Sequence, residues 1–358
     1  MTTSIQSVIT GTGSYIPPNN VPNSDFLDRS FLKPDGESYK KSNEEIIEKF
    51  AEITGIKSRR YAADDVMASD MGAKAGQKAL EAAGTDPNEL DYLIVAHNFG
   101  DLRADNPSVD MVPSLASRVK QKLSITNPSC IAYDLPFGCP GWLQGVIQSH
   151  YYLRSGDANK CLVIGTETLS RICDPHDRDS MIYADGAGAT VLEAKQNNMP
   201  VGILSHDART DAEKEAFFLQ MEPSFNDKRD DTLYMKMDGR KLYQYALSKV
   251  PGVVKTSLEK ADIPFEDVHK VLIHQANAKM DQAILDRLAK LYDQKVPDNI
   301  MPMTISWLGN TSVATVPTML DLILRDKMED HQIKKDDIIV LSSVGAGMNI
   351  NSVVYKMA

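Results

Sequence analysis

Residues 133–142, YDLPFGCPGW, place Cys139 between the end of a strand-like segment and the start of a helical pattern. The proline after this cysteine suits the first turn of a helix, where its missing N–H costs nothing. Residues 303–311, MTISWLGNT, repeat the arrangement, with Asn310 after a glycine and before another helical pattern. Each half also ends in a Gly-rich turn followed by an apolar run, at residues 185–188 and 344–347. This echo suggests a chain built from two similar halves.

Short apolar runs alternate with helical patterns on both sides of these stretches. The runs predict buried strands at 7–11, 92–96, 161–165, 188–192, 271–274 and 338–342. The helical patterns cover 70–83, 142–155, 242–261 and 278–292. Such alternation is typical of an α/β fold with buried, largely parallel sheets. The polar stretch 207–231 shows no strand pattern, and we interpret it as a surface connection near the boundary between the halves.

Size and composition restrict the class of protein. The 358 residues suit two domains or one large duplicated domain, and 42% apolar residues suffice for a sizeable core. A net charge of −10 argues against a general nucleic-acid binder. We see neither a secretory signal nor an apolar run of about 18 residues, so we expect no membrane span. The four cysteines form no C-x-x-C pair, which predicts free thiols in a reducing cytoplasm and no metal site.

Cys139 is a candidate nucleophile. A cysteine at a helix N-terminus lies at the positive end of the helix dipole, which stabilises a thiolate and lowers the thiol pKa. The alternative is a small buried core residue, because free cysteine is among the most buried residue types.

His274 and Asn310 are weaker candidates when each is taken alone. His274 ends an apolar strand run, so its imidazole can reach a pocket at the carboxyl edge of a sheet. A hydrogen-bonded structural histidine is the alternative for this residue. Asn310 precedes a helical pattern, where a plain helix N-cap is the alternative.

Taken together and in this order, the motifs resemble the β-ketoacyl-acyl-carrier-protein synthase III family of the thiolase superfamily. The resemblance covers nearly the whole chain, and its segments are GTGSYIP at 11–17, TGIKSRR at 54–60, Cys139, CDPHDR at 173–178, DGAGA at 185–189, HQAN at 274–277, GNTS at 309–312 and the C-terminal glycines. It implies a thiolase fold, with two similar halves at 1–205 and 206–358 in a layered αβαβα arrangement. It also implies a homodimer without cofactor or metal.

The resemblance also implies the chemistry of a condensing enzyme. Cys139 matches the acylated cysteine, and a thiolate exchanges one thioester for another at little cost. His274 and Asn310 match the pair that donates hydrogen bonds to the charge developing on a second thioester. The N–H groups of Cys139 and Ala346 would form a second oxyanion hole. Ala346 stands where family members often carry glycine.

Substrate-binding positions follow from the same resemblance, with departures. Arg178 matches an arginine that faces adenine, but Lys49 replaces the tryptophan opposite, with Phe50 as a substitute nearby. Asn277 is retained, whereas Arg240, after Gly239, replaces a pantetheine-contacting asparagine. Val112 stands where short-chain enzymes carry a bulky ring that closes the acyl pocket across the dimer. We therefore expect acyl groups longer than acetyl, and an acyl-carrier protein or an acyl-coenzyme A as donor.

Several functions fit these residues. The first is carbon–carbon bond formation, in fatty-acid initiation or in a secondary-metabolite pathway such as dialkylresorcinol or cyclohexanedione formation. An acyl transfer to oxygen or nitrogen without decarboxylation is an alternative. A catalytically silent subunit that binds acyl-carrier protein is a third, but retention of cysteine, histidine and asparagine together speaks against it.

Overall fold

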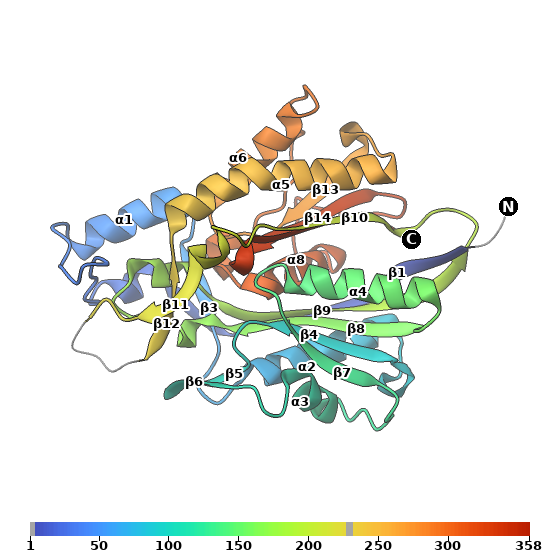
Figure 1. Cartoon of the computed structure of the whole chain (residues 1–358), viewed down its shortest axis with the longest axis horizontal. Helices are drawn as coiled ribbons and strands as arrows, with labels where there is room; N and C mark the ends of the chain where they lie inside the picture. The colour runs from blue at the N-terminus through green and yellow to red at the C-terminus, as the bar shows by residue number, and fades with distance from the viewer. Residues whose placement is uncertain (1–3, 227–231) are drawn as a thin grey trace.

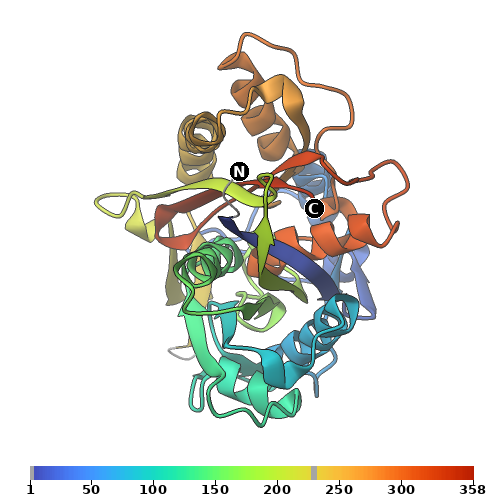
Figure 2. The ribbon, with the colours of Figure 1, turned by 90° about the vertical axis from the view of Figure 1, so that its right-hand side faces the viewer.

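The computed structural model describes residues 4–226 and 232–358, which form five stacked layers (Figure 1). Helices α2 (Ala68–Ala83) and α3 (Leu115–Lys122) cover the outer face of one sheet. Helices α4 (Gly141–Ser155) and α8 (Thr315–Leu324) lie between the two sheets. Helices α5 (Gly239–Ala261) and α6 (Ala278–Lys290) cover the outer face of the second sheet, at the opposite end of the stack (Figures 1 and 2). The expected αβαβα arrangement is confirmed.

The first sheet has five strands in the order β1-β9-β8-β4-β7. The strands are β1 (Ser4–Tyr15), β4 (Tyr92–His97), β7 (Ile131–Pro136), β8 (Lys160–Thr168) and β9 (Asp185–Asn197). Strand β4 runs parallel to β7 and β8, whereas β9 is antiparallel to β8 and β1. The carboxyl ends of β4, β7 and β8 therefore meet at one edge of the sheet.

The second sheet repeats this order with four strands, β10-β15-β14-β13. They are β10 (Gly202–Thr210), β13 (Val268–Ile273), β14 (Ile338–Gly345) and β15 (Asn349–Lys356). The edge pairs β1–β9 and β10–β15 are both antiparallel, and each contains one register shift, at residues 9–11 and 203–205. The sheets thus support the two similar halves, while the division of the chain after residue 205 stays a prediction.

The central strands are buried on both faces, which explains their apolar runs. On β8, Leu162 and Ile164 pack toward α2 and α3, and Val163 packs toward α4. On β14, Leu341 packs toward α4 and α8, and Val340 packs toward α5 and α6. Successive side chains on a strand point to opposite faces, so a strand between two helical layers has no polar face.

Two sequence predictions need correction. The sheets are mixed rather than largely parallel, because β9, β10 and β15 run antiparallel to their neighbours. The polar stretch after residue 207 contains the end of β10 and all of β11 (Leu219–Pro223), which pairs with β12 (Leu233–Met237). Residues 227–231 of that stretch lie outside the described part of the chain. Strand β11 escaped prediction although Leu219 and Met221 alternate with Gln220 and Glu222, because the run is only five residues long and lies within a charged stretch.

Smaller elements complete the part of the fold that surrounds the site. Helix α1 (Asn43–Thr54) begins with a capping box of Ser42 and Glu45, and ends at Gly55 in the left-handed conformation. Strands β2 (Asn19–Pro22) and β3 (Ser58–Tyr61) form a ribbon, as do β5 (Asp101–Arg103) and β6 (Asn106–Asp110). The short helix α7 (Ile305–Leu308) precedes Asn310. Within residues 4–226 and 232–358, no helix has the length and apolar character needed to cross a membrane.

Candidate active site

Two adjoining cavities lie where the two halves meet. The inner cavity has a volume of about 220 Å³, and Cys139, His274 and Asn310 all line it. The outer cavity, called the vestibule below, has a volume of about 970 Å³ and is lined by residues of α1, by residues 177–179 and by the start of α5. Met237, Leu242, Ala276, Met280, Gln220 and Asn310 line both cavities. The fold thus brings the three residues singled out from the sequence together, at the inner end of a path from the surface.

Cys139 lies directly before α4 and against the C-terminal turn between β14 and β15. Gly138 adopts φ +66°, which favours glycine. A Cβ on Gly345 would lie 2.5 Å from the backbone nitrogen of Cys139, so only glycine allows the turn to approach this closely. The close approach places the backbone of Ala346 beside the nucleophile candidate.

Ala346 keeps an ordinary backbone conformation in that turn. Its φ is not among the positive values, whereas the next two residues, Gly347 and Met348, have φ +73° and +50°. The Ala346 carbonyl accepts a hydrogen bond from Asn349 Nδ2 at 2.9 Å. The alanine Cβ is therefore tolerated where family members often have glycine, and Ala346 lines the inner cavity.

Ser312 contacts each member of the predicted triad. Its hydroxyl donates to the Cys139 sulfur at 3.3 Å, and its backbone N–H donates to Asn310 Oδ1 at 2.8 Å. A hydrogen bond with the Ser312 backbone also acts on the His274 ring. We did not single out Ser312 from the sequence, because a serine at the start of a helical pattern has a simple capping explanation. Its φ of +51°, uncommon outside glycine, is visible only in the structure.

Asn310 is held in one orientation by its neighbours. Its backbone N–H donates to the Ile182 carbonyl, and its own carbonyl accepts from Ala184 N–H, both at 2.9 Å. Because Ser312 N–H occupies Oδ1, the Asn310 amide nitrogen is the side-chain group left to donate toward the cavity. This contact, to the N–H two residues later, is one that a helix N-cap also makes, although the cap position of the short helix that follows is Thr311.

His274 follows the end of β13 and is 3% exposed. Its backbone N–H donates to the Ser342 carbonyl at 2.9 Å, and Nδ1 has no hydrogen-bond partner among the described residues. Burial lowers the pKa of His274 to about 4, and the hydrogen bond with Ser312 only partly opposes this. The imidazole is therefore neutral near pH 7, where one ring nitrogen donates and the other accepts.

The electrostatics of Cys139 differ from the sequence expectation. Burial raises the pKa of the Cys139 thiol to about 12, although the Ser312 hydrogen bond lowers it, and the charge of Glu167 adds to the rise. This direction is opposite to the one expected at a helix N-terminus, because desolvation of a buried sulfur outweighs the favourable local dipoles. The resting thiol is protonated, so attack on a thioester must be accompanied by loss of the thiol proton.

The remaining wall of the inner cavity is largely apolar. Seven of its apolar side chains come from the β11–β12 ribbon and the segments that face it, namely Leu169, Leu219, Met221, Met235, Met237, Leu242 and Met280. Methionine side chains are unbranched and flexible, so they adapt to flexible apolar groups. This wall suits an acyl chain or the apolar part of a carrier arm.

The vestibule contains the other predicted binding residues except Val112. Arg178, Gly239, Arg240 and Asn277 all line it. Asn277 also caps α6, because its side chain accepts from Met280 N–H at 3.1 Å. The charged residues that line the vestibule are Lys41, Lys49, Arg178, Lys236, Arg240 and Lys241, with Glu45, Asp177, Asp179, Glu222 and Asp238. Six cations against five carboxylates leave the vestibule nearly balanced in charge.

The aromatic group that faces Arg178 is Tyr39 rather than Phe50. The Arg178 guanidinium lies 5.2 Å from the centre of the Tyr39 ring. Phe50 is 8% exposed and packs in an apolar cluster with Phe26 and Ile46. Lys49, at the position of the expected tryptophan, forms a surface ion pair with Glu52 at 2.7 Å.

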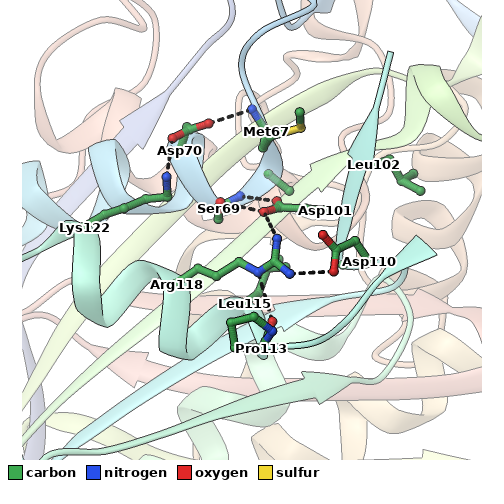
Figure 3. Close-up of polar contacts among 12 residues, drawn as sticks. Met67, Ser69, Asp70, Asp101, Leu102, Asp110, Pro113, Leu115, Arg118 and Lys122 are labelled. Atoms are coloured by element: carbon green, nitrogen blue, oxygen red, sulfur yellow. Dashed lines mark hydrogen bonds and ion pairs between the residues drawn. The ribbon is translucent and has the colours of Figure 1, made fainter. Parts of the chain in front are cut away.

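Val112 lies outside both cavities. It follows the β5–β6 ribbon and is 87% exposed, with Val109 and Met111 also exposed nearby. Arg118 of α3 holds this ribbon from behind, through hydrogen bonds to Asp101, Asp110 and the Pro113 carbonyl at 3.0, 2.6 and 2.9 Å (Figure 3). Asp101 is fixed in turn by Ser69 (Figure 3). The ribbon thus presents an apolar tip to the outside on a rigid support.

Comparison with known proteins agrees with this geometry. Residues 133–212 match the 3-oxoacyl-[acyl-carrier-protein (ACP)] synthase III family, and residues 258–357 match its C-terminal domain. The chain is 32% identical to a β-ketoacyl-[acyl-carrier-protein] synthase III of Cereibacter sphaeroides, over 98% of this chain and 99% of the relative.

Two solved structures show the same fold over their whole length. The synthase III (FabH) of Thermus thermophilus superposes with a TM-score of 0.80 at 28% identity, covering 98% of this chain and 99% of its own. The priming β-ketosynthase of the R1128 polyketide pathway superposes with a TM-score of 0.81 at 25% identity, covering 100% of this chain and 98% of its own.

Proposed function

Because the chain belongs to the 3-oxoacyl-[acyl-carrier-protein] synthase III family of condensing enzymes, we propose that it loads an acyl group onto Cys139 and joins it to a second acyl thioester. The product would be a β-ketoacyl thioester, used in fatty-acid initiation or in a secondary-metabolite pathway. The observation that carries the proposal is the meeting of Cys139, His274 and Asn310 on one small cavity, all in contact with Ser312.

In the loading step, the Cys139 sulfur attacks the carbonyl carbon of a donor thioester. The new carbon–sulfur bond forms as the bond to the carrier sulfur breaks, and the thiol proton leaves with the carrier as its free thiol. The N–H groups of Cys139 and Ala346 would donate to the carbonyl oxygen as it becomes negative. The close approach of Gly345 to Cys139 supports this pairing, because it puts both N–H groups in neighbouring backbone.

In the condensation step, a malonyl-type thioester loses carbon dioxide. The electron pair of the broken carbon–carbon bond develops as charge on the thioester oxygen, where neutral His274 and the Asn310 amide would donate hydrogen bonds. The resulting enolate carbon then attacks the acyl group, and the Cys139 sulfur departs with the electron pair of its bond to carbon. Neutrality of His274 suits this role, because a neutral donor needs no proton from solvent.

The acyl group is proposed to be longer than acetyl. The apolar methionine wall of the inner cavity supports this, as does the absence of a bulky ring at Val112. We propose a homodimer, in which the apolar tip at Val112 packs against a second copy of the chain. Exposure of Val109, Met111 and Val112 on a rigid ribbon supports such a contact, because exposed apolar clusters mark interaction surfaces.

The donor is proposed to be an acyl-carrier protein or an acyl-coenzyme A. Both carry a phosphopantetheine arm, and the guanidinium groups of Arg178 and Arg240 in the vestibule, with Tyr39 beside Arg178, suit a phosphate-bearing arm. The replacement of two coenzyme-contacting positions by Lys49 and Arg240 favours the acidic surface of a carrier protein over the free nucleotide.

The decisive experiment combines intact-protein mass with product analysis. The protein is incubated with acetyl, hexanoyl and octanoyl thioesters of coenzyme A and of acyl-carrier protein, and then with a malonyl thioester. We expect the acyl mass on the Cys139 peptide, followed by a β-ketoacyl product and release of carbon dioxide. Acylation followed by an ester or an amide would establish acyl transfer to oxygen or nitrogen instead. No acylation by any donor would leave the silent-subunit alternative.

A further inference from the structure

A continuous chain of hydrogen bonds leads from the Cys139 sulfur to a buried acid that the mechanism above does not use. The Ser312 hydroxyl donates to the sulfur at 3.3 Å and accepts from Asn98 Nδ2 at 3.2 Å. The same Asn98 amide nitrogen donates to Glu167 Oε1. Glu167 is 2% exposed, and Asn98 and Ser312 line the inner cavity with Cys139.

The fold brings these groups together from three distant parts of the sequence. Asn98 follows β4 and Glu167 lies near the end of β8, and these neighbouring strands run parallel. Their carboxyl ends therefore share one edge of the first sheet, where ligands of α/β proteins usually bind. Ser312 comes from the other half of the chain, and it fills the gap between that edge and Cys139.

We infer that Glu167, acting through Asn98 and Ser312, is a positioning residue that controls how readily the Cys139 thiol gives up its proton. The Glu167–Asn98 contact fixes the amide, and the amide nitrogen directs the Ser312 hydroxyl hydrogen toward the sulfur. A neutral Glu167 leaves this hydroxyl free to stabilise a thiolate. An ionised Glu167 opposes the thiolate by charge repulsion. The inference rests on the proposed role of Cys139 as nucleophile.

The charge state of Glu167, and with it the effect on the Cys139 thiol, is expected to change with pH. Burial raises the pKa of Glu167 to about 8, against the lowering effect of its Asn98 hydrogen bonds. Asp185, on the adjacent β9, adds to the rise, and Arg171 partly balances the charge of Asp185. Glu167 in turn raises the pKa of Cys139. Glu167 is therefore mostly neutral near pH 7 and becomes charged as the pH rises through about 8.

The test measures the rate of Cys139 alkylation by iodoacetamide from about pH 6 to about pH 10, by peptide mass, in the full-length protein. Glu167→Gln keeps the shape and the acceptor oxygen but cannot ionise. We expect it to match the wild type near pH 7 and to react severalfold faster above about pH 8. Asn98→Ala breaks the chain, and we expect both alkylation and acylation to slow by about tenfold, the value of one lost hydrogen bond.

Thr168→Val is the matched control. Thr168 is the next residue on β8, is 2% exposed, and its hydroxyl has no hydrogen-bond partner within the described residues. We expect a wild-type profile from it. If Glu167 has only a structural role, Glu167→Gln and Asn98→Ala would both slow alkylation of Cys139. A Glu167→Gln profile that follows the wild type at high pH would overturn the inference.

The alkylation results test the inference about Glu167 separately from the acylation results that test the proposed function. If Asn98→Ala does not fold, Glu167→Gln decides the question alone, because it is nearly isosteric. If wild-type Cys139 takes no acyl group from any donor, the proposed function fails, whereas the alkylation profiles still test the control of the thiol by Glu167.

Discussion

The two loop-to-helix junctions that face each other across the inner cavity hold the same place in the two halves but carry different chemistry. The junction before α4 carries Cys139, whose backbone lies against the turn of the other half. The junction before α8 carries Asn310 and Ser312, which direct donors toward the cavity. In the proposed mechanism, the two similar halves supply one acceptor of acyl groups and one set of donors for developing charge. The comparison indicates that loading and condensation can be separated by mutation.

The largest effect is expected at the first junction. Cys139→Ala should abolish acylation and condensation while the fold is retained, because the change removes one sulfur from a half-buried position. Intact-protein mass with a reactive acyl thioester measures the loss, and circular dichroism checks the fold. Cys130→Ala, at a buried cysteine outside the cavity, is the control and should be acylated normally. Acyl mass on the Cys139 peptide of the Cys139→Ala protein would refute the assignment.

Substitution of Asn310 at the second junction, or of His274 beside it on the cavity wall, should affect condensation alone. His274→Ala and Asn310→Ala should still become acylated but lose condensation by at least about 10²-fold, as expected for an oxyanion donor. Acylation is followed by mass and condensation by product formation. Thr311→Ser is the control, because the Thr311 hydroxyl bonds Thr315, and a serine keeps that contact. Equal loss of both steps in the two alanine variants would contradict the division between the junctions.

A third substitution, at Val112, tests whether the preferred acyl chain length is set outside both junctions. Each buried methylene stabilises binding by about 0.8 kcal/mol, so three or four more methylenes would favour a medium chain over acetyl by roughly two orders of magnitude or less. Val112→Phe should remove this preference by closing the pocket across the proposed dimer. Acylation rates with acetyl, hexanoyl and octanoyl donors measure it.

Ile131→Phe is the control, because Ile131 is an exposed apolar residue on β7, outside the apolar tip. A preference of the wild type for acetyl, or an unchanged rate for long donors in Val112→Phe, would show that acyl length is decided elsewhere.

The smallest effect concerns stability at acid pH. Burial lowers the pKa of His274 to about 4, below the value of about 6.5 in an unfolded chain. The unfolded state therefore binds the proton first, and the stability contributed by neutral His274 is present above about pH 6.5 and lost as the pH falls toward 4. We expect the free energy of unfolding to fall by about 2 kcal/mol from this residue between neutral pH and about pH 5.

Urea unfolding at several pH values measures this dependence. His274→Gln should show a shallower fall than the wild type, although His150, whose pKa burial also lowers to about 4, leaves part of the slope. His269→Gln, at an exposed position, should keep the wild-type slope. A steeper fall in His274→Gln would mean that the imidazole is stabilised in its charged form.

The layers, and the three candidate residues that the fold brings to one cavity, could be predicted, whereas the neighbours of those residues could not. Strands buried on both faces and helices with a clear apolar period can be recognised from about ten residues of sequence each. The β11–β12 ribbon cannot, since its strands are short and half-buried. Tyr39, rather than Phe50, faces Arg178 because α1 buries Phe50 in its own core.

By itself, the sequence determined the alternation of buried strands with helices, the position of Cys139 before a helix, and the resemblance that pairs it with His274 and Asn310. These follow from local patterns and from short motifs, which need no knowledge of distant contacts. Only the tertiary structure decided that Ser312 joins the three residues, that Glu167 reaches them through Asn98, and that burial raises the pKa of the thiol. The Asn98–Glu167 contact arises when β4 and β8 pair in the first sheet, and the Ser312 contacts and the desolvation of the sulfur arise when the two halves pack against each other.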